Sequence, residues 1–359
     1  MAQFITVCPH CNSALQVQSE WIGQEVECPI CHNAFVIPPP VQDRITPQTV
    51  ESAPKKKKVI ITLSIIIAAL LGIGITAVTI NSEQKRIAEE KRIAEEKRVA
   101  ELLKTAQALG IIFSDDNKTL VNCPEDVEEV IIPSCVTTIG KSAFERCSDL
   151  QSVIIPNSVT NIGDRAFYGC FNLQSVNIPN SVTKIGEEAF AGCTDLQSVI
   201  IPNSVTNIGK SAFERCTYLQ SVIIPNSVTK IGYRAFSVCD NLKSVNIPDS
   251  VTEIGEEAFW GCKNLRSVTI PDSVTNIGAN AFEGCKNLQS VNIGNSVTEI
   301  RANAFCGCEN LQSVNIPDSV TKIGWSAFEG CSNLRSVTIP RNCEVAPSAF
   351  PAGCKIIRR

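Results

Sequence analysis

Two Cys-Pro-x-Cys pairs near the N-terminus are the residues of this chain whose types and spacing best suit chemistry. Cys8 and Cys11 form the first pair, and Cys28 and Cys31 form the second after 16 intervening residues. Four thiolates at this spacing suit a closed tetrahedral zinc site, because structural zinc takes four ligands and binds thiolate sulfur well. We therefore predict that these cysteines bind a structural Zn²⁺. Redox catalysis by a Cys-x-x-Cys pair is the rival interpretation, and the presence of two matched pairs favours zinc.

The only two histidines, His10 and His32, each lie beside one of these pairs. They either ligate or tune the metal, or they are exposed, and we expect exposure because four cysteines already complete the site. The remaining chain therefore lacks a histidine nucleophile or general base. Gly-Lys-Ser at Gly140 and at Gly209 imitates a phosphate loop but lacks the glycine five residues earlier. We expect no enzymatic activity.

The segment around the cysteine pairs is assigned residues 1–37. Its apolar residues suit short strands packed around the metal. A fold of ~35 residues has a small core, so the metal would supply most of its folding energy. The segment resembles the small zinc ribbons found at the N-termini of bacterial proteins. It contains no Lys or Arg, and the net charge of the chain is −4, so we expect no nucleic-acid binding.

A single membrane-spanning helix is predicted at residues 59–80. These 22 residues carry no charge, and ~20 apolar residues span a hydrocarbon core of ~30 Å as a helix. The linker before them, residues 38–58, is rich in proline and ends in four lysines. A small residue recurs at every fourth position. This either allows two helices to form a homo-oligomer or reflects the frequency of small residues in such helices: Ser64, Ala68, Gly72 and Thr76.

Two observations orient this helix with the N-terminus in the cytoplasm and residues 111–359 outside it. Four lysines abut the N-terminal end of the span, whereas the first basic residue after it is Lys85. The thiols of a zinc ribbon also need the reducing conditions of the cytosol. The fourteen cysteines beyond residue 37 argue the other way, because free thiols are unusual in an oxidising compartment.

Residues 81–110 repeat Lys-Arg-Ile-Ala-Glu-Glu with a period of six and are predicted to form a charged helical stalk. Oppositely charged residues recur three and four positions apart, which supports a solvated helix. A period of six turns successive isoleucines to different faces, so no coiled-coil seam forms. A weak oligomer through the apolar residues at the end of the stalk is the alternative: Leu102, Leu103, Ala106 and Leu109.

From Ile131 onward a 23-residue unit occurs ten times, the last copy being shorter. In each unit Leu-x-x-Val-x-Ile places Val and Ile on one side of a short strand, which a proline ends. A second short extended stretch follows, and Ala-Phe is expected to form one helical or 3₁₀ turn that places the ring in the core. Stacked units share a core that one unit cannot bury alone. The Ala-Phe phenylalanines are Phe144, Phe167, Phe190, Phe213, Phe236, Phe259, Phe282, Phe305, Phe328 and Phe350.

The unit Ile-Pro-x-Ser-Val-Thr-x-Ile-Gly-x-x-Ala-Phe-x-x-Cys-x-x-Leu resembles the BspA-like leucine-rich repeats of bacterial surface proteins. The resemblance covers residues 111–359 and implies a leucine-rich-repeat solenoid of short parallel strands and short helical turns. The stretch from Ile112 to Val121 resembles the N-terminal cap of that family, a small hairpin, and we place the cap at about residues 111–132. Members of the family are implied in binding host or matrix proteins and other cells, although a fold alone does not fix function.

One cysteine recurs in every unit, which predicts a buried column in which Cys acts as a small hydrophobic residue. Neighbours in such a column lie ~5 Å apart, within the range of a disulfide. We expect the reduced form. The column consists of Cys147, Cys170, Cys193, Cys216, Cys239, Cys262, Cys285, Cys308, Cys331 and Cys354.

The outward positions of the first strand in each unit form columns on one face of the solenoid. Such a face is the usual binding surface of repeat proteins. Near-uniform columns suit a protein or glycan partner, and a spacer that binds nothing is the alternative. The candidate surface consists of Gln151, Ile154, Gln174, Asn177, Gln197, Ile200, Gln220, Ile223, Lys243, Asn246, Arg266, Thr269, Gln289, Asn292, Gln312, Asn315, Arg335 and Thr338.

The sequence therefore predicts a non-enzymatic, membrane-anchored binding or adhesion protein with an external solenoid and a cytoplasmic zinc ribbon. The main alternative is a scaffold whose solenoid faces the cell interior. A third hypothesis is that the chain is a transmembrane regulator that acts through the zinc ribbon.

Overall fold

The computed structural model describes residues 3–7, 14–18, 25–27, 34–36 and 77–359. The chain divides into two compact units, Met1–Asn81 and Ser82–Arg359. The predicted linker, residues 38–58, and most of the predicted membrane span lie outside the described residues. Within the described ranges, no helix has both the length and the apolar character that a membrane span requires.

The N-terminal unit contains two antiparallel hairpins. Strand β1 (Gln3–Val7) pairs with β2 (Ala14–Gln18), and β3 (Glu25–Glu27) pairs with β4 (Ala34–Val36). The first cysteine pair falls in the connection between β1 and β2, and the second falls between β3 and β4. Both connections lie outside the described residues.

The charged six-residue repeats form most of helix α2 (Ala77–Ala108). Four of the predicted ion pairs are present, with N–O distances of 2.5 to 3.8 Å: Glu89–Arg92, Arg92–Glu96, Arg86–Glu90 and Glu95–Arg98. Their side chains are more than half exposed, and each such pair adds only about 0.3–0.5 kcal/mol to helix stability. These ion pairs alone stabilise α2 only weakly, so we expect apolar packing against the solenoid to stabilise its C-terminal end.

The end of α2 is packed against the first coil. Ala106 is buried in the same hydrophobic cluster as the solenoid core, and Leu102 and Leu103 are half-buried. Further back along the helix, Glu95 accepts a hydrogen bond of 2.7 Å from the Ser134 hydroxyl. The C-terminal part of the predicted stalk thus covers the otherwise open end of the apolar core, as the terminal unit of a solenoid requires.

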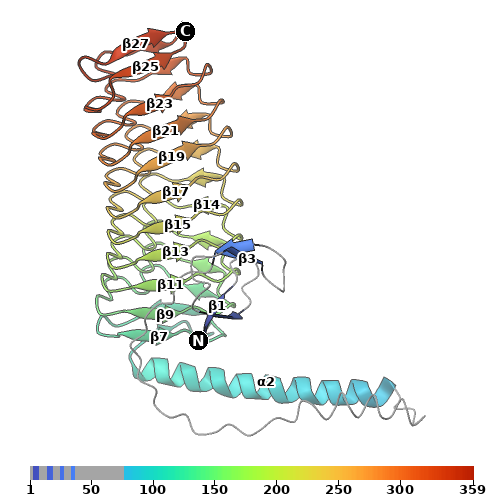
Figure 1. The fold of residues 1–359 in the computed structure, drawn as a ribbon. Coiled ribbons are helices and arrows are strands. Elements are labelled where there is room, and N and C mark those ends of the chain that lie inside the picture. Colours follow the sequence, from blue (N-terminus) through green and yellow to red (C-terminus); the bar gives the residue numbers. More distant parts are fainter. Residues whose placement is uncertain (1–2, 8–13, 19–24, 28–33, 37–76) are drawn as a thin grey trace. The chain divides into compact units, whose positions relative to one another are not determined.

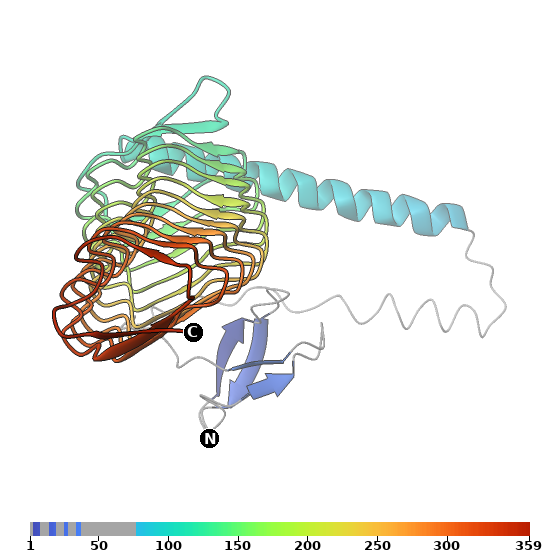
Figure 2. The same ribbon diagram turned by 90° about the horizontal axis from the view of Figure 1, so that it is seen from above.

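A small antiparallel hairpin of β5 (Ile112–Phe113) and β6 (Thr119–Asn122) follows, as predicted for the cap. The 23-residue units then stack as coils, each contributing two short strands, and most of these pair in parallel with the same strands of the neighbouring coils (Figures 1 and 2). Partners in the ladders, such as Val176 and Val199, are 23 residues apart. The predicted solenoid of short parallel strands is confirmed.

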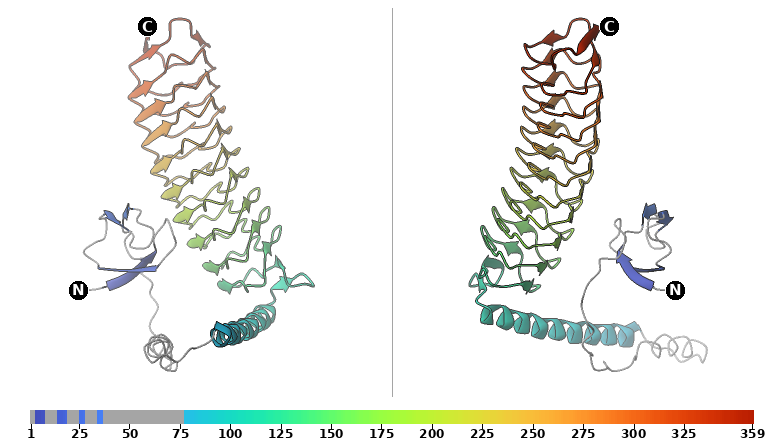
Figure 3. Two further views of the ribbon diagram at one scale, coloured as in Figure 1. Left: turned by 90° about the vertical axis from the view of Figure 1, so that its right-hand side faces the viewer. Right: turned by 60° about the vertical axis from the view of Figure 1, so that its left-hand side comes forward.

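The longer strands line one side of the solenoid, which we call the front face, and the two-residue strands line a second side (Figure 3). The front strands are β7 (Glu129–Ile131), β9 (Ser152–Ile154), β11 (Ser175–Asn177), β13 (Ser198–Ile200), β15 (Ser221–Ile223), β17 (Ser244–Asn246), β19 (Ser267–Ile270), β21 (Ser290–Ile293), β23 (Ser313–Asn315), β25 (Ser336–Ile339) and β27 (Lys355–Arg358). The others are β8 (Thr138–Ile139), β10 (Asn161–Ile162), β12 (Lys184–Ile185), β14 (Asn207–Ile208), β16 (Lys230–Ile231), β18 (Glu253–Ile254), β20 (Asn276–Ile277), β22 (Glu299–Ile300), β24 (Lys322–Ile323) and β26 (Glu344–Val345).

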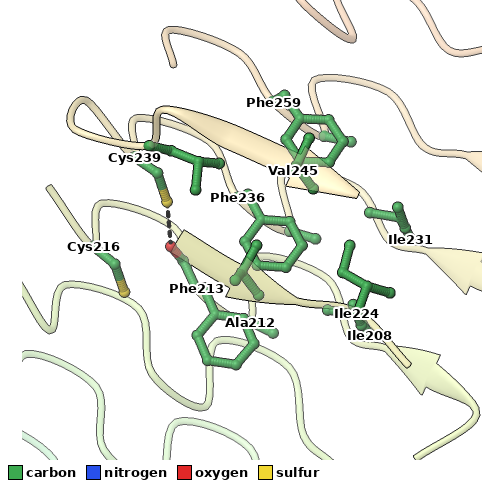
Figure 4. Packing of buried hydrophobic residues seen from close by; sticks show 14 of the residues in the cluster. Ile208, Ala212, Phe213, Cys216, Ile224, Ile231, Phe236, Cys239, Val245 and Phe259 are labelled. Carbon is green, nitrogen blue, oxygen red and sulfur yellow. Dashed lines mark hydrogen bonds between the residues drawn. The ribbon is translucent and has the colours of Figure 1, made fainter. Parts of the chain in front are cut away.

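The ten Ala-Phe rings stack into a continuous column through the core, and Figure 4 shows three of them, Phe213, Phe236 and Phe259. Successive centroids from Phe144 to Phe350 lie 4.8 to 5.5 Å apart, and the ring planes are within 10° of parallel. All rings except the last are fully buried. The coil spacing therefore sets the ring spacing, and burial of these rings is a main source of solenoid stability.

The predicted helical or 3₁₀ turn at Ala-Phe is wrong. The residue just before the alanine, for example Ser211 or Arg234, has a φ between 52° and 58° in every coil. A left-handed residue cannot continue a right-handed helical turn. The phenylalanine N–H donates instead to the alanine carbonyl of the next coil, as from Phe213 to Ala235 at 2.9 Å. Backbone hydrogen bonds thus join neighbouring coils at this corner.

Candidate binding surface

The front face presents the columns that the sequence predicts. In most front strands the valine, such as Val199, points into the core, and the residues on either side of it are exposed. The exceptions are β27, which is exposed along its whole length, and β23, whose Val314 is half-buried. All the predicted surface residues are exposed except Thr338, which is half-buried. Because strand side chains alternate between the two sides, one register places every column on the same face.

The front face has two chemically different halves. In the N-terminal half, the isoleucines are between 53% and 59% exposed and are flanked by glutamines: Ile154, Ile200 and Ile223. In the C-terminal half, Asn and Thr replace isoleucine, and a shallow hollow of about 550 Å³ lies over β19, β21, β23 and β25. Lys243, Arg266 and Arg335 border this half and form no ion pair within the described part of the chain. A partner that covers the face meets an apolar zone and a polar, cationic zone.

The cysteine column is buried except at its last member, Cys354, which is half-buried. All fourteen cysteines from Cys123 to Cys354 are free thiols. Eight of them, Cys170 to Cys331 in the column, donate to the phenylalanine carbonyl of the preceding coil at 3.1 to 3.3 Å, as Cys239 does to Phe213 (Figure 4). Burial raises the pKa of the Cys262 thiol to about 12 and also raises the pKa of the Cys239 thiol well above its ordinary value. Thiolates are the reactive form of cysteine, so these groups are inert near neutral pH.

The four predicted zinc ligands, Cys8, Cys11, Cys28 and Cys31, lie outside the described residues. In the part of the chain that the structure describes, no group of three or more His, Cys, Asp or Glu side chains is arranged to hold a metal.

A second hollow, which the sequence reasoning missed, lies on the turns after the Ala-Phe dipeptides. It has a volume of about 810 Å³ and crosses the first coils. We call it the turn groove. The signal in the sequence is a set of departures from the repeat, because Arg146, Arg215 and Val238 stand where most units have glycine. An exposed aromatic residue, Phe171, also breaks the repeat there.

The chain is similar to a known family of repeat proteins and to several solved structures. The family described as "BspA type Leucine rich repeat region (6 copies)" matches residues 116–243 and 229–357. A leucine-rich repeat protein from Bacteroides ovatus is 28% identical over 69% of this chain and 81% of its own, with a TM-score of 0.42. A leucine rich cell surface protein from Faecalibacterium prausnitzii is 28% identical over 68% and 84%, also with a TM-score of 0.42. No curated protein matches the chain.

Proposed function

The chain belongs to the BspA-type leucine-rich repeat family, and we propose that it is a non-enzymatic, membrane-anchored binding protein whose solenoid presents the front face to a protein or glycan. The observation that carries this proposal is the front face itself. Its outward columns run through nine consecutive coils, and the structure describes no segment that covers them. Rows of Gln, Ser and Asn supply hydrogen-bond donors and acceptors, and the exposed isoleucines supply apolar area, which together suit an extended contact.

We also propose that residues 59–80 anchor the chain in a membrane, with the N-terminus in the cytoplasm and the solenoid outside. The support is the uncharged stretch of 22 residues and the four lysines that precede it. The buried, inert thiols of the solenoid are also compatible with an exterior location, because burial limits their oxidation.

A structural zinc ion is proposed at Cys8, Cys11, Cys28 and Cys31. The described hairpins support this assignment, because each cysteine pair falls in the connection of one antiparallel hairpin. Knuckles of this kind, two Cys-x-x-Cys turns on two hairpins, supply the four thiolates of a closed site. The metal would stabilise the fold of residues 1–37 and take no part in binding at the front face.

Protease shaving of intact cells tests the orientation. One antibody recognises the solenoid and a second recognises residues 1–37. We expect trypsin to remove the solenoid signal from intact cells and to leave the N-terminal signal, because the membrane protects the cytoplasmic side. Protection of the solenoid until the cells are lysed would instead favour the alternative, a scaffold whose solenoid assembles partners inside the cell. Lysed cells treated identically provide the control for cleavage of both epitopes.

A further inference from the structure

We propose that the turn groove is a second binding site, separate from the front face, for an extended segment of a partner protein that carries two acidic residues around one apolar residue. The site spans the first coils and is built from Arg146, Phe171 and Arg215. Its volume of about 810 Å³ lies within the ~300–1,000 Å³ typical of ligand sites.

The sequence of the groove departs from the repeat at a left-handed position, at a cost in stability. The second residue after each of the first nine Ala-Phe phenylalanines is left-handed, and it is glycine at Gly169, Gly192 and four later coils. The three exceptions are Arg146, Arg215 and Val238, with φ of 62°, 60° and 57°. All three line the turn groove. Left-handed non-glycine residues are strained, most of all when β-branched, and these three coils lack the glycine that avoids this strain in the other coils.

The two glycines between the arginines form the floor of the groove. A Cβ at Gly169 would lie 3.8 Å from Cζ of Phe171, and a Cβ at Gly192 would lie 4.0 Å from Cε1 of the same ring. The Phe171 ring therefore lies beside both glycines and is 49% exposed. A Cβ at Gly169 would also lie 3.7 Å from Cγ of Arg146. The order along the groove is thus a guanidinium, an aromatic ring and a second guanidinium.

The acidic residues that line the groove form no ion pair with Arg146 or Arg215 in the described part of the chain, so both guanidinium groups are available to a ligand. Glu188 is paired with Arg165 at 3.5 Å, and Glu214 lies 4.0 Å from Arg234. Arg146 and Arg215 are exposed and have no ion-pair partner among the residues that the structure describes.

One further carboxylate, Glu125, lines the groove in the first coil without an ion pair in the described structure. It disfavours a third acidic residue beyond Arg146. The groove therefore fits a segment with two acidic residues, held by guanidinium–carboxylate pairs.

The spacing of the groove specifies the segment. Arg146 and Arg215 are three coils apart, which is ~14 Å at the ~4.8 Å spacing of parallel strands. An extended peptide rises ~3.3 Å per residue, so side chains at i and i+4 lie ~13 Å apart on the same side. The residue at i+2 then faces Phe171. The expected motif is Asp/Glu-x-Φ-x-Asp/Glu, where Φ is an apolar residue, because aromatic and arginine side chains contribute most to protein interfaces.

Fluorescence anisotropy of the full-length protein with a labelled Ser-Glu-Ser-Leu-Ser-Glu-Ser peptide tests this proposal. The decisive variant combines Arg146→Gly and Arg215→Gly, which restores the residue that other coils carry, so its unfolding midpoint should equal or exceed that of the wild type. We expect its affinity for the peptide to fall roughly tenfold or more, because both carboxylate contacts are lost. The matched control, Arg266→Gln with Arg335→Gln, removes two unpaired front-face arginines and should bind as the wild type does.

Three results would overturn the proposal. The first is equal binding of a peptide with both Glu residues replaced by Lys. The second is undiminished peptide binding, or no binding in either protein, when the double Arg→Gly variant is compared with the wild type. The third is binding of an oligogalacturonate probe that needs both arginines while the peptide does not bind, which would make the ligand an acidic glycan.

Discussion

Replacing Phe236 with alanine is expected to destabilise the solenoid by about 3–5 kcal/mol, the range for a fully buried phenylalanine. The Phe236 ring is fully buried and stacks on Phe213 and Phe259 at 5.5 Å on both sides. Truncation leaves a cavity in the middle of the ring column, and two ring contacts are lost at once. Because each coil contacts only its neighbours, the solenoid is expected to unfold first at this coil.

Urea unfolding of the full-length protein, followed by the fluorescence of the solenoid residues Trp260 and Trp325, measures this loss. Phe236→Leu is the matched control, because leucine keeps most of the buried volume and should cost less than about 1.5 kcal/mol. The two tryptophans lie in later coils than Phe236 and report whether the C-terminal coils unfold with it. A loss below about 1 kcal/mol in the alanine variant would show that the ring column does not hold the coils together.

Removal of zinc is expected to unfold residues 1–37 and to leave the solenoid intact. Structural zinc contributes about 10–16 kcal/mol to the folding of comparably small domains. Two hairpins with strands of three to five residues are marginal without such support. The solenoid belongs to the other compact unit, from Ser82 onward, and has its own core. Its unfolding transition should therefore be unchanged when the metal is removed.

Metal content and amide hydrogen exchange of the full-length protein test this prediction. We expect Cys8→Ser and Cys31→Ser to abolish zinc binding and the protection of amides in β1 to β4. Cys306→Ser, in the solenoid, is the matched control because it changes one half-buried thiol outside the proposed site. Protected hairpins in a protein freed of zinc would contradict the assignment, as would loss of zinc in the control.

The repeat made the solenoid predictable because its chemistry is local and recurs. A 23-residue period fixes which residues stack, so the strands, the Phe column and the exposed face all follow from one unit. The left-handed residue before each alanine could not be predicted, since Ser211, Arg234 and Glu257 share no residue type that signals a positive φ. That conformation is imposed by hydrogen bonds between coils, which appear only after stacking.

Two further features depended on tertiary structure. The reason for cysteine at the column position appears only in the structure, where the Cys239 thiol donates a hydrogen bond to the Phe213 carbonyl of the preceding coil. The packing of Ala106 against the first coil could not be predicted from the sequence, because the period of six gives α2 no continuous apolar stripe. The turn groove was not predicted, although arginine replaces glycine at its positions in the sequence, because the left-handed φ angles that give this replacement its meaning appear only in the structure.

The central claim, that the front face binds a partner, is tested most directly by comparing two variants of equal charge on arrays of purified proteins and glycans. The front-face variant is Ile154→Lys with Ile223→Lys. The control is Asn161→Lys with Asn276→Lys, in a column where Lys184 and Lys230 already stand. We predict that the wild type and the control bind the same partner, and that the front-face variant binds it about tenfold more weakly or less. Equal binding by all three proteins, or an equal loss in the control, would contradict the claim.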